Sequence, residues 1–288
     1  MKIFLFTSAA LLLSLTTIKA QDNHAKTDTV FFEDFNEKTL DRSKWNVEDR
    51  VHTVNNEQQA YVDSAATIYL VHGRAAEGAK NGALVLKPVY QPGFAINNKK
   101  YDFISGRINT KQKMEFTYGT ASARMKMSSG AGMWPAFWAL GNGKWPDCGE
   151  IDMMETVGDS SWISNALHGP GYFGNTPLAY RAFFPAGENV NQWHVYSVDW
   201  TADSLIFKVD GKVTYTVTRA MVEHYGKWAY DNPKFIILNF ALGGGYPEGV
   251  NKIKTPYPGL SGYSVEQIKA GKAKILVDWV LVTRNANQ

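Results

Sequence analysis

The sequence LIFKVDGKVTYTVT, residues 205–218, contains two runs in which apolar and polar side chains alternate. Alternation with a period of two is typical of a β-strand that buries one face. The dipeptide Asp210-Gly211 separates the runs, and Asp-Gly is favoured in the two-residue turns that join antiparallel strands. This stretch therefore predicts a β-hairpin with strands at 205–209 and 212–218.

Short runs of the same kind recur along the chain, at 114–127, 194–200, 235–240 and 275–283. Helical periodicity is nearly absent, and only 264–270 predicts a short helix. Many short strands without intervening helices favour an antiparallel sandwich or barrel in one domain. About 260 residues is large for an immunoglobulin-like sandwich, so a jelly roll with long loops fits better. The segments 88–105 and 243–263, rich in Gly and Pro, are predicted to be such loops.

Composition excludes several classes of protein. The chain has 288 residues, and its single cysteine excludes a disulfide scaffold and a multi-cysteine zinc site. A formal net charge of +3 is too weak for a nucleic-acid-binding surface, so no nucleic-acid partner is expected. The nine tryptophans are unusual, because such large side chains serve either a core or a stacking surface.

The first 20 residues have the pattern of a secretory signal peptide: a lysine, an apolar stretch and a small residue at the exit. The only cysteine is Cys148, so a lipid-anchored form is not expected. Residues 21–29 are predicted to be a short polar leader, and residues 30–288 a single catalytic domain. We expect a secreted or periplasmic monomer with no membrane contact, whose formal charge is +1 once two signal lysines are removed.

The strongest functional signal is the acidic segment GEIDMME, residues 149–155. Residues two apart in a strand share a face, so Glu150 and Asp152 point the same way. A β-bulge at Met153-Met154 would bring Glu155 to that face as well. Carboxyl groups this close cannot all ionise cheaply, so one holds a proton while another stays charged. Such a pair suits glycoside hydrolysis; an exposed acidic face, with or without a bound cation, is the alternative.

The residues around this segment resemble glycoside hydrolase family 16, and within it the laminarinase-type endo-β-1,3-glucanases. The resemblance rests mainly on GMWPAFWALG at 132–141 and WPDCGEIDMME at 145–155. Weaker landmarks lie along nearly the whole remaining chain: FEDF at 32–35, NNEQQAY at 55–61, SGRI at 105–108, FTYG at 116–119, LHGP at 167–170, NFALGG at 239–244 and VDWV at 277–280. The resemblance implies an all-β fold, a β-jelly-roll sandwich of two antiparallel sheets with a concave substrate cleft.

The resemblance also implies roles for the three acidic residues in a retaining reaction. In that family the first glutamate of the motif is the nucleophile and the last is the acid/base. Carried over, Glu150 forms the glycosyl-enzyme, and Glu155 protonates the leaving oxygen and later deprotonates water. Asp152 lies between them and is expected to bond to Glu150. The two residues between Asp152 and Glu155 match the bulged subtype rather than the shorter ExDxE form of lichenases.

Several other residues are candidates for binding the sugar chain. An aromatic ring offers a flat partner to the apolar face of a pyranose, although each tryptophan could equally be part of the core. Histidine, asparagine and arginine side chains could bind sugar hydroxyls, or instead anchor loops. The candidates are Trp134, Trp138, Trp145, His168, Asn56 and Arg107. We assign Trp193, Trp200 and Trp279 to the core, because they lie in alternating strands.

Two further predictions concern a metal and a thiol. Many family members carry a structural calcium far from the cleft, and Asp278 matches its side-chain ligand. Backbone oxygens near Glu33 and Gly82 would complete that site, since calcium prefers oxygen ligands. The chemistry itself needs no cofactor. Cys148 is interpreted as a buried small apolar residue, because neighbouring carboxylates would raise the pKa of its thiol.

Three functions remain open at this stage. The first is a secreted retaining endo-β-glucanase acting on β-1,3-glucan or mixed-linkage β-1,3/1,4-glucan. The second keeps the same machinery but acts on a marine galactan such as agar, porphyran or carrageenan, although the low net charge gives little support to a sulfated polymer. The third is a β-glucan-binding protein without activity; such relatives lose the catalytic carboxylates, whereas Glu150 and Glu155 are both present.

Overall fold

The computed structural model describes residues 27–49, 54–96 and 98–285. The predicted signal peptide at 1–20 and most of the predicted leader lie outside these residues. Strand β1 (Thr27–Glu33) begins inside the predicted leader, because residues 27–29 already pair with the last strand, β18 (Ile275–Asn285). The polar sequence at 27–29 does not itself predict a strand; these residues are extended because they pair with the end of β18.

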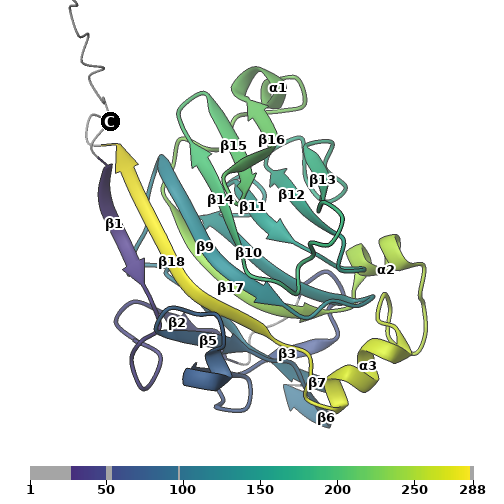
Figure 1. Cartoon of the computed structure of the whole chain (residues 1–288). Coiled ribbons are helices and arrows are strands. Elements are labelled where there is room, and N and C mark those ends of the chain that lie inside the picture. Colours follow the sequence, from purple (N-terminus) through teal and green to yellow (C-terminus); the bar gives the residue numbers. More distant parts are fainter. Residues whose placement is uncertain (1–26, 50–53, 97, 286–288) are drawn as a thin grey trace, which may run out of the picture.

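Most strands form two large antiparallel sheets that lie face to face (Figure 1). The first sheet has eight strands in the order β16-β15-β14-β9-β18-β5-β4, with β1 also paired to β18. Its other members are β4 (Ile68–His72), β5 (Gly82–Leu86), β9 (Gly119–Met127), β14 (His194–Trp200), β15 (Ser204–Val209) and β16 (Lys212–Thr218). The hairpin of β15 and β16 turns at Asp210 and Gly211 as predicted, with φ of 50° and 77°.

The second sheet has seven strands in the order β13-β12-β11-β10-β17-β8-β2. They are β2 (Asn46–Val47), β8 (Arg107–Asn109), β10 (Met133–Gly141), β11 (Glu150–Glu155), β12 (Trp162–His168), β13 (Ala179–Phe183) and β17 (Lys234–Leu242). All pairings in both large sheets are antiparallel. The two sheets confirm the predicted all-β sandwich.

The two segments predicted to be loops contain regular structure, which corrects that prediction. Residues 88–105 form β6 (Val89–Ile96) and β7 (Lys99–Ser105), which pair with β3 (Gln59–Tyr61) in a small third sheet. Residues 243–263 include the helix α2 (Gly245–Asn251). The predicted helix at 264–270 is α3 (Gly262–Lys269), whose start is capped by the Ser261 side chain. The remaining helices are α1 (Arg219–Glu223) and a 3-10 turn at Gly73–Ala76.

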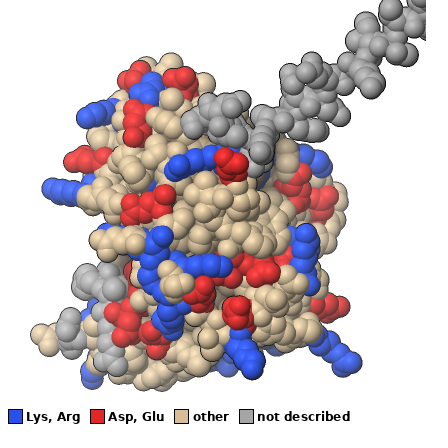
Figure 2. Space-filling view, turned by 90° about the vertical axis from the view of Figure 1, so that its left-hand side faces the viewer, with Lys and Arg blue, Asp and Glu red and all other residues tan. Residues whose placement is uncertain are grey.

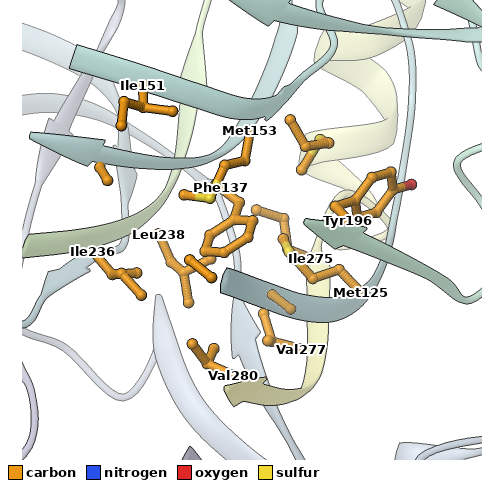
Figure 3. Close-up of a cluster of buried hydrophobic side chains, with 14 of the residues drawn as sticks. Met125, Phe137, Ile151, Met153, Tyr196, Ile236, Leu238, Ile275, Val277 and Val280 are labelled. Atoms are coloured by element: carbon orange, nitrogen blue, oxygen red, sulfur yellow. The ribbon is translucent and has the colours of Figure 1, made fainter. Parts of the chain in front are cut away.

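The main core fills the space between the two large sheets (Figure 3). Phe137, Ile151 and Leu238 of the seven-stranded sheet are buried there with Met125 and Val277 of the eight-stranded sheet. Because side chains alternate along a strand, the residues between these core positions point to the opposite side. We call that opposite side of the seven-stranded sheet the open face; it carries the candidate site.

On the face in Figure 2, basic and acidic side chains are interspersed around an uncharged area, and neither sign of charge dominates that face. None of the helices in the described part of the chain is long and apolar enough to cross a membrane.

Candidate active site

Strand β11 brings the three acidic residues of the motif, Glu150, Asp152 and Glu155, to the open face, and we call these three residues the acidic row. Glu150 pairs with Leu140 of β10, Asp152 with Trp138 and Glu155 with Ala136, so the partners on β10 are spaced evenly by two. The register shifts at Met153-Met154, where one extra residue is accommodated. The same shift occurs against β12, where Asp152 faces Ala166 and Glu155 faces Ser164. The predicted bulge is therefore present.

Glu150 lies between an indole and an imidazole. Trp145 donates its Nε1 hydrogen to Oε2 of Glu150 over 2.9 Å. His168 faces Glu150 across the β11–β12 pair, with its Nε2 3.9 Å from Glu150 Oε1 and 3.3 Å from Asp152 Oδ2. Trp145 is 43% exposed and contacts Phe173 edge to face. An exposed indole that orients a carboxylate can also contact a bound sugar.

Glu155 has a different and more buried set of neighbours. Trp134 donates its Nε1 hydrogen to Glu155 Oε1 over 2.8 Å. The ring of Trp134 meets Tyr246 of α2 edge to face at 5.5 Å. Burial raises the pKa of Tyr246 to about 12, and the charge of nearby Glu155 contributes to this rise. Tyr246 was missed by sequence reasoning, because it lies in a segment predicted to be a loop.

Burial dominates the electrostatics of the three carboxyl groups. Burial and the nearby charge of Asp152 raise the pKa of Glu150 to about 8. Burial also raises the pKa of Glu155, while the hydrogen bond from Trp134 lowers it, with a result of about 7. Burial and the charge of Glu155 raise the pKa of Asp152, whereas a hydrogen bond with Glu150 lowers it. At neutral pH the row therefore retains a proton that isolated carboxylates would lose.

A second group of polar residues extends from the acidic row across β10, β17 and β8. Trp138 donates to Asn239 Oδ1 over 2.7 Å, and Asn239 donates to the Tyr61 hydroxyl. Arg107 lies over the Trp138 ring at 4.9 Å and pairs with Glu48 at 2.9 Å. Trp138 thus has one ring face covered by a guanidinium group. Asn239 was not among the predicted site residues, although its NFALGG landmark marked the position.

Asn56, the remaining predicted binding residue, lies in an exposed turn before β3 with a φ of 57°, and its backbone lies against Gly244, next to α2. The adjacent Glu57 is buried and accepts hydrogen bonds from Gln59 and Tyr61. The predicted core position is correct for Trp200, which is buried, but Trp193 and Trp279 are only half buried.

The family model for glycosyl hydrolases family 16 matches residues 47–256. The chain belongs to this family. A curated relative, glucan endo-1,3-beta-glucosidase A1 of Niallia circulans, is 32% identical over 76% of this chain and 34% of its own length. Keratan-sulfate endo-1,4-beta-galactosidase of Sphingobacterium multivorum is 27% identical over 85% of this chain and 55% of its own length. The chain thus spans about a third and about half of these two relatives.

A solved structure of the same family supports the fold. The laminarinase catalytic domain of Thermotoga maritima is 28% identical to this chain, with a TM-score of 0.74. The alignment covers 91% of this chain and 99% of that domain. The similarity confirms the predicted jelly roll. Enzymes of family 16 need no cofactor for catalysis.

A buried lysine beneath the acidic strand was also missed by sequence reasoning. Lys234 Nζ donates to the carbonyl oxygens of Cys148 and Ala229 and to Asn232 Oδ1, at 2.9, 3.0 and 2.5 Å. Gly149 fits here because a Cβ would lie 2.2 Å from the Ala229 oxygen. These bonds fix the chain just before Glu150. The sequence feature that could have indicated it is a lysine at the start of the mostly apolar strand β17.

Burial raises the pKa of the Cys148 thiol, in line with its interpretation as a buried, unreactive residue.

Two clusters in the described part of the chain have the residue types of a metal site. One is Glu150, Asp152 and His168 in the acidic row, and the other is Glu188, His194 and Asp210. In the second cluster His194 Nδ1 is 2.6 Å from Asp210 Oδ2, and His194 Nε2 is 3.0 Å from the Asn189 carbonyl oxygen. Both ring nitrogens are thus engaged, so His194 has no free lone pair for a metal.

The side-chain ligand predicted for a structural calcium, Asp278, already has two partners. Asp278 Oδ2 pairs with Arg124 at 2.6 Å, and Asp278 Oδ1 accepts the Lys80 amide at 2.8 Å. The other predicted ligands are backbone oxygens near Glu33 and Gly82; the Glu33 side chain itself accepts the Phe35 amide and lies 3.4 Å from Lys44 Nζ. An arginine already neutralises the one side-chain ligand, and a second cation beside it would be repelled.

The raised pKa of Glu150 predicts a pH-dependent gain in stability for Glu150→Gln. Between about pH 4.3 and the folded pKa of about 8, the folded protein holds a proton that the unfolded chain has lost. The free energy of unfolding therefore falls as the pH rises through this window. At pH 8 the variant should be more stable than the original protein by about 1–3 kcal/mol, and near pH 4 the two should be equal.

Thermal unfolding of both proteins at pH 4 and pH 8 measures this difference. The exposed Glu266→Gln, on α3, is the control and should show the same difference at both values. A Glu150→Gln variant with no extra stability at pH 8 would contradict the raised pKa of this carboxyl.

Proposed function

We propose that this chain is an endo-acting retaining β-glucanase. The observation that carries the proposal is the bulged strand β11, which presents Glu150, Asp152 and Glu155 on one face with an indole donor on each glutamate. Two carboxyl groups with different neighbours, one charged and one protonated, are what double displacement at a glycosidic bond requires. Membership in family 16 supports the same reaction.

The three carboxyl groups titrate together, and the reaction starts from the form in which the retained proton lies on Glu155 and Glu150 is ionised. In the first step, Glu150 in this form attacks the anomeric carbon. The bond from that carbon to the bridging oxygen breaks, and Glu155 gives its proton to this oxygen. The products are a glycosyl ester on Glu150 and a free chain end. In the second step Glu155, now ionised, takes a proton from water, whose oxygen attacks the same carbon and releases Glu150. The configuration at the anomeric carbon is retained.

The neighbouring side chains orient the two reacting groups. Trp145 holds one oxygen of Glu150 and leaves the other free to attack. Asp152 and His168 lie close to Glu150 and balance its charge as it forms and loses the ester bond. Trp134 fixes one oxygen of Glu155 in the same way. Trp138, with Asn239 and Arg107, lies beside the row and is proposed to bind the sugar chain.

The proposed substrate is a β-1,3-glucan of the laminarin type or a mixed-linkage β-1,3/1,4-glucan. The relative from Niallia circulans and the Thermotoga laminarinase domain support a glucan. A second candidate is a galactan, because the relative from Sphingobacterium multivorum is named as a galactosidase acting on keratan sulfate. We propose further that the protein is exported, by the signal at residues 1–20, and acts as a monomer.

A substrate panel tests the proposal. Purified protein is incubated with laminarin, curdlan, lichenan, barley β-glucan, agarose and keratan sulfate, and reducing ends and product sizes are followed. We expect release from laminarin or the mixed-linkage glucans, with intermediate-size products early and the β-anomer first in proton NMR. Cleavage of agarose or keratan sulfate alone would establish the galactan alternative, and no cleavage of any polymer would refute both.

Removal of metal ions should leave the stability of the fold unchanged. Asp278 already has a cationic partner in Arg124, so no ion is needed to neutralise it. We expect EDTA or added calcium to change the melting temperature by less than about 2 °C, which corresponds to less than about 1 kcal/mol for a chain of this size. A melting temperature that falls by several degrees with EDTA and recovers with calcium would restore the calcium site.

A further inference from the structure

The last strand of the seven-stranded sheet, β13, carries two side chains on the open face beyond the acidic row. Glu155 faces Ser164 of β12, and Ser164 faces Arg181 of β13. Two residues further along the same strands, and so on the same face, Trp162 faces Phe183. By this register Arg181 and Phe183 share the face of the three carboxyl groups, two strands away, at about 10 Å from β11.

Both side chains are available to a ligand. Phe183 is 67% exposed, and the contact of this apolar ring with water is unfavourable in free energy. Arg181 is exposed, its guanidinium carbon lies 3.9 Å from the centroid of the Trp162 ring, and it forms no ion pair with the described residues. A phenyl ring can stack on the apolar face of a sugar, and a guanidinium group beside it can donate to the sugar hydroxyls.

The apolar surface continues around the edge of the sandwich. Tyr180 of β13 stacks on Tyr215 of β16, with ring centroids 5.4 Å apart and planes 20° apart, and Tyr180 is 48% exposed. A hollow of about 190 Å³ adjoins Phe183 between β13 and the β15–β16 hairpin. Its wall combines apolar side chains, including Val213, with the polar side chains of Glu188 and Lys212. This mixture of ring faces and polar groups is typical of sugar-binding surfaces.

We infer that Arg181 and Phe183 form a distal contact for the polysaccharide, which holds the chain where it leaves the acidic row. The inference rests on the proposed function and extends it. The inference is based on the continuous surface between the two places. The two side chains lie on the face that carries the reacting groups, and β13 is the edge strand of the sheet on that side. The contact is reached only by sugars beyond the first unit past the reacting bond. Its loss should therefore affect a polymer more than a trisaccharide, which can bind with a single unit on that side.

The variants Phe183→Ala and Arg181→Ala, alone and combined, test this contact on laminarin and on a β-1,3-linked glucose trisaccharide. We expect the KM for laminarin to rise about fivefold for each single variant and more for the pair, as for an exposed binding contact. The kcat for laminarin and the kcat/KM for the trisaccharide should change less than about twofold. Tyr263→Ala is the matched control, since Tyr263 is 68% exposed on α3, at the opposite end of the molecule (Figure 1).

Three results would overturn the inference. The first is an unchanged KM for laminarin in the double variant. The second is an equal loss on laminarin and on the trisaccharide, which would indicate damage to the catalytic residues. The third is a dimer of the original protein that the double variant loses, which would assign the surface to self-association. Failure of the proposed function itself is distinct, because the original protein would then cleave no glucan.

Discussion

Replacing Glu150 with serine will lower the rate of glucan hydrolysis by roughly 10⁴- to 10⁶-fold, the range seen when members of a covalent catalytic group are removed from other hydrolases. Serine has a shorter side chain than glutamate and carries no carboxylate, so it cannot form the glycosyl ester. Substrate binding should persist, since Trp138, Asn239 and Arg107 remain in place. The measurement is kcat on the best polymer of the panel, with binding of the same polymer followed by calorimetry.

Two further measurements separate loss of the nucleophile from loss of the fold. Azide or formate added to the Glu150→Ser variant should restore part of the cleavage of an activated aryl glycoside, because a small anion can occupy the space of the missing carboxylate. Glu266→Gln, on the exposed side of α3, should keep full activity. A Glu150→Ser variant that retained more than about 1% of the original rate would exclude this residue as the nucleophile.

The strands that the sequence predicts best are those whose alternation is uninterrupted. β14 and β16 match the predicted ranges, and β15 starts one residue earlier. Asp210 and Gly211 accept the positive φ values that a tight hairpin needs, so the turn could be read locally. The predicted strand at 114–127 starts only at Gly119, because Tyr118 and Gly119 have positive φ values that break the extended chain.

The elements that the sequence hides depend on tertiary contacts. In β6, Pro92 and Gly93 interrupt the pattern, and the strand forms because β7 supplies its hydrogen bonds. Helix α2 contains two glycines and a proline and has little helical propensity of its own. It is held by contacts around it, including the Gly245 amide bonded to the Asn55 carbonyl. Local sequence rules therefore favoured loops at both places.

The acidic row was predictable, whereas its neighbours were not. The spacing of Glu150, Asp152 and Glu155 on a strand leads to a bulge by parity alone. The indole bonds of Trp134 and Trp145 depend on how a neighbouring strand and a loop fold back onto β11. Trp138 was expected to stack on sugar. In the structure its indole nitrogen donates to Asn239, and the Arg107 guanidinium group covers part of its ring. The sequence therefore indicates these residues but not the partners that they contact.

Replacing Glu155 with glutamine will lower kcat on glucan by about 10²- to 10⁴-fold, the usual contribution of a general acid and base. The loss should be much smaller for a glucoside with an activated aryl leaving group, because that group departs without a proton. The pH profile is the second readout. The coupled carboxyl groups lose the proton that Glu155 donates as the pH rises through about 7 to 8, so the kcat/KM of the original protein should fall in this range.

The variant should lose this descending limb of the profile, since glutamine does not titrate. Trp134→Phe is the matched comparison: it removes the hydrogen bond to Glu155 but keeps the carboxyl. That bond lowers the pKa of Glu155, so its loss should shift the descending limb to higher pH while activity falls only modestly. Equal losses of Glu155→Gln on glucan and on the activated glucoside would contradict the acid role, because proton donation would then not distinguish the two leaving groups.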